Sequence, residues 1–182
     1  MELRALRGMP VIAVESGERL GEVHDALIDP VDRRIALLRV RRGGRFRGDL
    51  SDVSFGHLQS LGRDAVMVPN RATLRPASEA PSLLRIDELV GLRVVTERGE
   101  ARGTIDDAEF DPANGTLTAL VIAPPGLGGL LGRRQTVTVD RVRTIGRDTV
   151  VLVEPITSEE HQAEREDRDG SSPSAEGEEA SE

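Results

Sequence analysis

The hydrophobic residues of this chain occur in short runs rich in valine, leucine and isoleucine, and glycine, proline, aspartate and asparagine separate the runs. Short apolar runs bounded by turn residues are typical of β-strands. Only 57–61 and 86–90 suggest single helical turns. Many short strands of this kind predict an all-β fold built from small barrels or sandwiches. The predicted strands cover residues 11–14, 20–28, 34–40, 50–55, 65–68, 92–96, 102–110, 116–122, 135–139 and 149–152.

The two halves of the chain repeat one another. Gly17 and Gly99 each open a segment that reads Gly-Glu, then Gly, an aliphatic residue, Asp and finally Asp-Pro. All these positions keep one offset of 82 residues (17 to 99). An internal repeat predicts two copies of one structural unit. The matched positions are Gly21 and Gly103, Val23 and Ile105, Asp25 and Asp107, and Asp29-Pro30 and Asp111-Pro112.

The order and spacing of these positions, together with their duplication, resemble the PRC-barrel family. Each copy has a leading glycine, an aliphatic strand, the Gly-x-aliphatic-x-Asp segment, Asp-Pro and a late Gly-x-Asp turn before its last strand. The leading glycines are Gly8 and Gly91, and the late turns begin at Gly62 and Gly146. The resemblance implies two tandem small β-barrels that act as binding and assembly modules. It supplies no catalytic motif.

Composition and charge divide the chain into four parts. We expect a first barrel over residues 1–75, a linker over 76–82 marked by Pro76 and Pro81, and a second barrel over 83–156. The net charge of −8 comes from the end of the chain, since residues 157–182 contain ten acidic residues and two arginines. This segment has almost no apolar residues, so its composition predicts a disordered acidic tail.

Composition also limits the functions that the chain can perform. There is no cysteine, which excludes disulfides and thiolate chemistry. No apolar run approaches the roughly 20 residues of a membrane helix, and the N-terminus has no apolar signal-peptide region. We therefore expect a cytoplasmic protein without a membrane span. We also expect no cofactor and no metal site, because the three histidines show no metal-ligand spacing.

The candidate catalytic groups have simpler structural interpretations. Asp25 and Asp107 could be paired carboxylates, as in acid–base catalysis, but they could equally bind backbone groups inside a barrel. Asp29 and Asp111 precede prolines and are typical of turn caps. His24 lies beside Asp25, yet the second copy has Asp106 in its place. No set of nucleophile, base and stabilising group is recognisable, so the sequence predicts that the protein is not an enzyme.

The copies differ most at the turn that follows the third predicted strand. The first copy has a basic tip, in which Phe46 lies among arginines, and the second has a glycine-rich apolar tip. Loops on a rigid scaffold often carry binding function, so we predict that both tips contact partners. The candidate partner-binding residues are Arg41, Arg42, Arg45, Phe46, Arg47, Leu127, Leu130 and Leu131.

Two functions remain open from the sequence. The first is a scaffold that mediates protein–protein assembly, with another protein or with itself. The alternative is an RNA- or ribosome-associated factor that uses the basic face from Arg33 to Arg47, where arginine would contact phosphates and Phe46 would stack on a base. The acidic tail could also cover this basic face.

Overall fold

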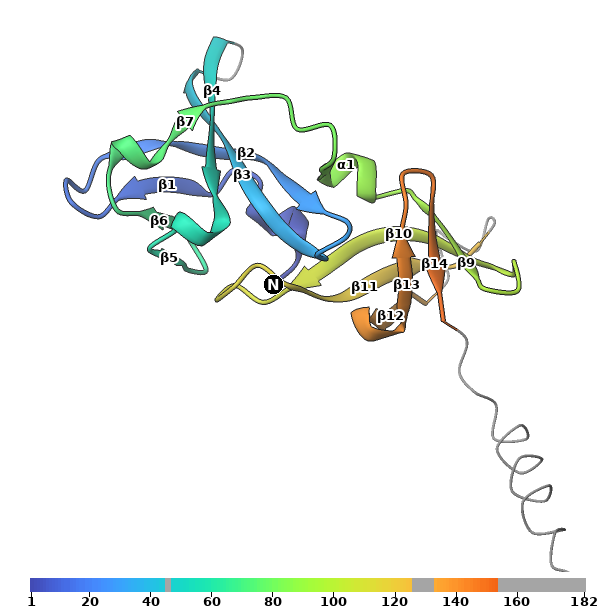
Figure 1. Cartoon of the computed structure of the whole chain (residues 1–182). Helices are drawn as coiled ribbons and strands as arrows, with labels where there is room; N and C mark the ends of the chain where they lie inside the picture. The colour runs from blue at the N-terminus through green and yellow to red at the C-terminus, as the bar shows by residue number, and fades with distance from the viewer. Residues whose placement is uncertain (45–46, 126–132, 154–182) are drawn as a thin grey trace, which may run out of the picture.

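The computed structural model describes residues 1–44, 47–125 and 133–153, and in these it is almost entirely β. The strands form two sheets, one from each half of the chain, which lie side by side (Figure 1). The first sheet has the order β5-β6-β1-β2-β3-β4-β7, with β8 added to β2. The second has the order β12-β11-β10-β9-β14-β13. The predicted all-β fold of two small tandem barrels is confirmed.

Both sheets are built from the same succession of elements. In each, a short turn leads into a four-residue strand, then into a long strand that pairs with the next one. The first half contains η1 (Leu3–Leu6), β1 (Pro10–Ala13), β2 (Arg19–Asp29), β3 (Arg34–Gly44), β4 (Arg47–Ser54), η2 (Phe55–His57), β5 (Ser60–Leu61), β6 (Val66–Val68), η3 (Arg71–Thr73) and β7 (Arg75–Pro76). The second half contains β8 (Leu84–Arg85), α1 (Ile86–Leu89), β9 (Arg93–Thr96), β10 (Ala101–Phe110), β11 (Leu117–Ala123), β12 (Gln135–Thr138), η5 (Val139–Arg141), β13 (Val142–Ile145) and β14 (Thr149–Leu152).

Two local predictions were wrong. The basic segment from Arg41 was predicted as a hairpin tip, but β3 continues to Gly44 and pairs with β4 as far as Arg47. Arg41 and Arg42 therefore lie in a strand, because the antiparallel ladder continues through the glycines. The helical turn predicted at 57–61 lies earlier, at Phe55–His57, and β5 follows it.

The second glycine of the repeated segment is explained by close strand packing. A Cβ atom at Gly103 would lie 1.9 Å from the carbonyl oxygen of Ala123, and one at Gly21 would lie 2.4 Å from that of Arg41. Gly103 also has a φ of 129°, a conformation that favours glycine. Both positions need glycine because the backbone of the neighbouring strand leaves no room there for a Cβ atom.

The repeated Asp25 and Asp107 stabilise a bulge in each long strand. The pairing register shifts at these residues, so His24 and Asp106 are the extra residues. Each buried carboxylate accepts a hydrogen bond from the next backbone N–H, at 2.9 Å from Ala26 and 2.7 Å from Ala108. The structural interpretation of these aspartates is thereby confirmed.

The aspartates before proline cap turns, as predicted. Asp29 Oδ1 accepts hydrogen bonds from the N–H groups of Val31 and Asp32, at 2.9 and 3.0 Å. Asp111 Oδ1 accepts one from Ala113 N–H at 2.9 Å. Such contacts satisfy turn N–H groups that the ladder leaves unpaired.

The two repeats meet through equivalent residues. Ile35 N–H donates to the Gly115 carbonyl, and Leu117 N–H donates to the Arg33 carbonyl, both at 2.8 Å. Gly115 and Leu117 are the positions 82 residues after Arg33 and Ile35. A contact in which each unit uses the same patch is the mark of two-fold symmetry. The chain is therefore arranged like a symmetric dimer in one polypeptide.

The leading segments extend this symmetry, because each docks on the long strand of the other repeat. Arg85 and Leu84 pair with Leu27 and Ile28 of β2. The N-terminus makes the matching contact with β10, where Glu2 bridges Glu109. Figure 1 shows the N-terminus beside β10 and β11, and α1 close to β2. The leading segments thus exchange sides between the repeats.

One hydrophobic cluster runs through both repeats. It includes Ile28 and Leu38 from the first sheet and Phe110 and Leu120 from the second. Phe55 and Phe110 meet edge to face across the junction, with ring centroids 6.3 Å apart. The predicted division into 1–75, a 76–82 linker, 83–156 and a 157–182 tail stays a prediction. Among the residues described, no helix is long and apolar enough to cross a membrane.

Candidate binding cleft

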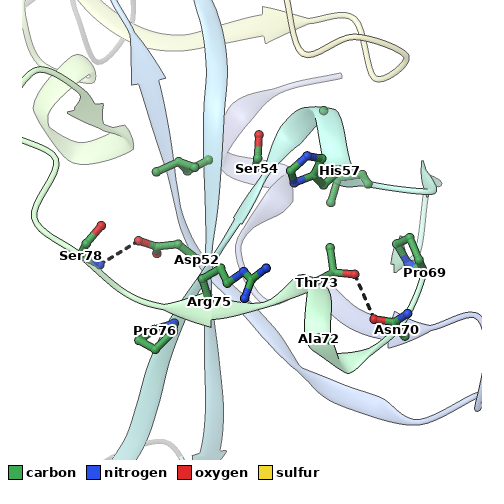
Figure 2. A pocket seen from close by; sticks show the side chains of 13 residues that line it. Asp52, Ser54, His57, Pro69, Asn70, Ala72, Thr73, Arg75, Pro76 and Ser78 are labelled. Atoms are coloured by element: carbon green, nitrogen blue, oxygen red, sulfur yellow. Dashed lines mark hydrogen bonds between the residues drawn. The ribbon is translucent and has the colours of Figure 1, made fainter.

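The first repeat carries an open cleft with a volume of about 710 Å³. Its walls are the outer part of β4, the turn η2, and the chain from Pro69 to Ser78, which passes back over β4. Figure 2 shows His57 on one side of the cleft and Asn70 with Thr73 on the other. A volume in this range is typical of sites that hold a small ligand or a few residues of a peptide.

An ion pair holds the wall of the cleft in place. Arg39 binds both carboxylate oxygens of Asp52, at 2.8 and 3.0 Å, and also donates to the carbonyl of Ser78 at 2.7 Å. Ser78 N–H donates back to Asp52 at 3.2 Å. Asp52 thereby raises the pKa of Arg39 through its hydrogen bonds. This closed network ties the returning segment to β4, so the cleft has a rigid edge.

The remaining lining is part apolar and part polar. Leu37, Leu58 and Ala72 provide apolar surface, and Ser54 and His57 provide polar groups. Neither the Ser54 hydroxyl nor the His57 imidazole hydrogen-bonds to another residue that the structure describes. Free donors and acceptors around apolar surface suit a peptide, whose backbone is polar and whose side chains vary.

The second repeat also has a hollow, but other residues line it. Its volume is about 190 Å³, and Gln135 and Val137 contribute to its lining. These residues match Ser51 and Val53, whereas the cleft is lined by Asp52 and Ser54. The chain corresponding to Pro69–Ser78 would begin at Val153 and lies almost wholly outside the described residues.

The basic face is largely occupied by contacts within the protein. Arg33 donates to the carbonyls of Val139 and Arg143, at 3.2 and 3.0 Å, across the junction of the repeats. Arg39 binds Asp52, and Arg41 binds Glu22 at 2.8 Å. These three arginines stabilise the fold, which leaves fewer cations for a phosphate backbone than the sequence suggested.

The predicted partner-binding residues are only partly described. Arg41 and Arg42 are half-buried in β3, and the backbone of Arg47 begins β4. Arg45, Phe46, Leu127, Leu130 and Leu131 lie outside the described residues. Sequence reasoning missed the cleft itself. Its lining residues come from distant parts of the first repeat and form no motif.

A second charged cluster lies where the leading segments cross. Arg7 donates to Asp87 at 2.8 Å and to Asp25 at 3.3 Å. Its guanidinium lowers the pKa of Asp87 below the usual value. Asp25 also accepts a hydrogen bond from Ile86 N–H at 3.3 Å, so this aspartate links the two repeats. Among the described residues, no group of three or more histidine, aspartate or glutamate side chains could hold a metal ion.

Comparison with known protein families agrees with a fold of two repeats. The family model of the PRC-barrel domain matches residues 1–75 and again residues 81–157. The chain belongs to the PRC-barrel family. PRC-barrel domains are in general non-catalytic binding domains, and this chain carries two of them in tandem. No curated protein matches it.

One solved structure that matches the chain is a putative 16S ribosomal RNA processing protein, RimM, from Pseudomonas aeruginosa. It is 21% identical to this PRC-barrel protein, and the comparison covers 82% of this chain and 96% of that one, with a TM-score of 0.31. A likeness at that level carries no argument about the function of this chain.

Proposed function

We propose that this protein is a non-enzymatic tandem PRC-barrel scaffold that mediates protein–protein assembly. The observation that carries the proposal is the cleft of the first repeat. It combines a volume of about 710 Å³ with apolar lining residues and with the side chains of Ser54 and His57, which have no hydrogen-bond partner among the described residues. The partner would insert an extended segment of a few residues between His57 and Thr73.

The charge arrangement supports a protein partner over RNA. Arg33, Arg39 and Arg41 are engaged with carbonyl or carboxylate groups of the protein itself. An RNA-binding surface needs cations that are free to neutralise phosphates. The tips remain candidates for further contacts: Arg42, Arg45, Phe46 and Arg47 in the first repeat, and the apolar residues 127, 130 and 131 in the second.

The test is to select binding peptides and then fill the cleft. A random peptide library displayed on phage would be panned against the full protein, and the best peptide would be titrated by calorimetry. Ala72 is exposed and lines the cleft, so Ala72→Trp should fill it and weaken peptide binding at least about tenfold. Ala113→Trp, in an exposed turn of the second repeat, is the matched control and should bind like the parent.

The alternative is tested with the same proteins. A single-stranded RNA oligonucleotide would be titrated by fluorescence anisotropy at low and high salt, with Arg42→Ser as the variant. If the selected peptides bound Ala72→Trp with the same affinity as the parent, the cleft would not be the binding site. Salt-sensitive RNA binding that Arg42→Ser weakens, without any selected peptide, would replace protein assembly with RNA binding.

A further inference from the structure

The outer edge of β12 distinguishes the second repeat from the first. In the first repeat, the matching strand β4 is covered on its outer side by β7, which pairs Pro76 with Ser51 and Arg75 with Asp52. In the second sheet β12 is the last strand, and no described residue pairs with its outer side. An exposed strand edge presents a row of unpaired N–H and C=O groups that can accept another strand.

The internal repeat predicts what should cover this edge. Ser51 pairs with Val40 and Gln135 pairs with Ile122, so Ser51 and Gln135 hold the same place in their sheets. Pro69 and Val153 follow the matching strands β6 and β14. Glu160 comes seven residues after Val153, just as Pro76 comes seven residues after Pro69. The chain after Val153 therefore has the right length and starting point to reach β12.

Charge supports the same assignment, with both signs reversed between the repeats. In the first repeat, Arg75 of the covering segment lies opposite Asp52 of the covered strand, whose carboxylate Arg39 also binds. In the second, the following segment contains Glu154, Glu159 and Glu160. Arg133 and Arg141 flank β12, are exposed, and have no ion pair within the part of the chain that the structure describes. Opposite charges on the two partners favour their association.

We propose that residues 154–160 bind the outer edge of β12 as an added antiparallel strand, with Glu160 opposite Gln135 and Glu159 opposite Thr136. The second repeat then ends near residue 160, and the acidic remainder of the chain begins there. Attachment through a short connection gives this segment an effective concentration on the order of millimolar. A weak intrinsic affinity is therefore sufficient, and a partner strand would have to displace the segment to reach β12.

Hydrogen–deuterium exchange on three chains tests the proposal: the full chain, a chain ending at Gly170 and a chain ending at Val153. Residues 133–139 should exchange slowly in the first two, and at least about tenfold faster when 154–160 is removed. The chain ending at Gly170 is the matched control, because it loses acidic residues but keeps the proposed strand. Exchange at 93–96, in an inner strand of the second sheet, should be the same in all three, which also reports that the second repeat of the shortest chain is folded.

Charge reversal in the full chain provides a second reading that does not depend on truncation. Glu159→Arg with Glu160→Arg should speed exchange at 133–139, and adding Arg133→Glu with Arg141→Glu should slow it again. The control, Glu164→Arg with Glu166→Arg, should leave it unchanged. Equal exchange in the full chain and the chain ending at Val153 would overturn the proposal. Fast exchange at 133–139 in the chain ending at Gly170 would also overturn the proposal. So would protection at 133–139 that rises with protein concentration, because a second copy of the chain would then cover the edge.

Discussion

The two repeats share one strand order, but they have different residues at several matching positions. At the edge of the sheet, the first repeat has the ion pair Arg39–Asp52, whereas the second has Val121 and Thr136 at the matching positions. The first repeat also carries the cleft beside this ion pair. The comparison teaches that the fold requires the strands and their glycines, while the residues at the edge can differ between the repeats.

The junction between the repeats shows the same principle. Arg33 and Gly115 occupy equivalent positions, and both have a positive φ, 52° and 77°. Gly115 fits against Phe55, whose ring would lie 2.8 Å from an added Cβ. Arg33 instead keeps its side chain and uses it to reach the carbonyls of Val139 and Arg143. The fold needs a left-handed residue at both places, but each repeat uses it for a different contact.

The largest expected effect comes from the residue that joins the two cores. Phe110 is fully buried and packs on Phe55 of the other repeat. Phe110→Ala should lower the free energy of unfolding by about 3–5 kcal/mol, because it removes a large buried ring and leaves a cavity. Calorimetry of the full chain should show one transition shifting to lower temperature. Two transitions, with only the second repeat destabilised, would mean that the repeats unfold independently.

Alanine substitutions at the matched glycines Gly21 and Gly103 should lower the free energy of unfolding by different amounts. Gly103→Ala should destabilise by about 3 kcal/mol, because its Cβ would overlap a backbone oxygen at a φ that alanine rarely adopts. Gly21→Ala should cost less, about 1–2 kcal/mol, since its contact is longer and its φ needs no glycine. Urea unfolding measures both. Equal losses in the free energy of unfolding would show that β2 and β10 adjust to an added Cβ atom to the same extent.

The ion pair at the cleft can be exchanged for the residues of the second repeat. Arg39→Val alone should lower stability by about 2–3 kcal/mol, because Asp52 is buried and would lose its partner. Adding Asp52→Thr, which copies Val121 and Thr136, should recover most of that loss in urea unfolding. The double variant should still bind selected peptides more weakly, since Ser78 loses its anchor. If the double variant were no more stable than Arg39→Val, contacts other than the Arg39–Asp52 ion pair would contribute to the loss.

The smallest effect concerns the charge contact between the leading segments. Arg7 holds the pKa of Asp87 below its usual value, so Asp87 stabilises the folded protein above its unfolded pKa. That contribution is lost as pH falls below about 4. Asp87 is largely exposed, so Asp87→Asn should cost less than about 0.5 kcal/mol at pH 7. The difference from the parent in the free energy of unfolding should vanish toward pH 3.

The sequence predicted the fold well because its signals were local. Strand-forming runs and turn aspartates before proline each depend on neighbouring residues. The turn caps were confirmed, and so were the strands, apart from the basic segment after Arg41, which extends β3. The turn at 57–61 was misplaced, since a single 3₁₀ turn has little sequence signature. The cleft could not be predicted, because its residues come from β4, η2 and the segment that passes back over them.

By itself, the sequence determined the number of repeats, the strand-forming segments and the positions of the repeated glycines and capping aspartates. These follow from steric and hydrogen-bonding rules that act over a few residues. The tertiary structure alone decided that the leading segments exchange sides, that both cores join at Phe110, and that three arginines of the basic run are used within the protein. Those outcomes depend on contacts between residues far apart in the chain, which burial and charge pairing select only once the two sheets have met.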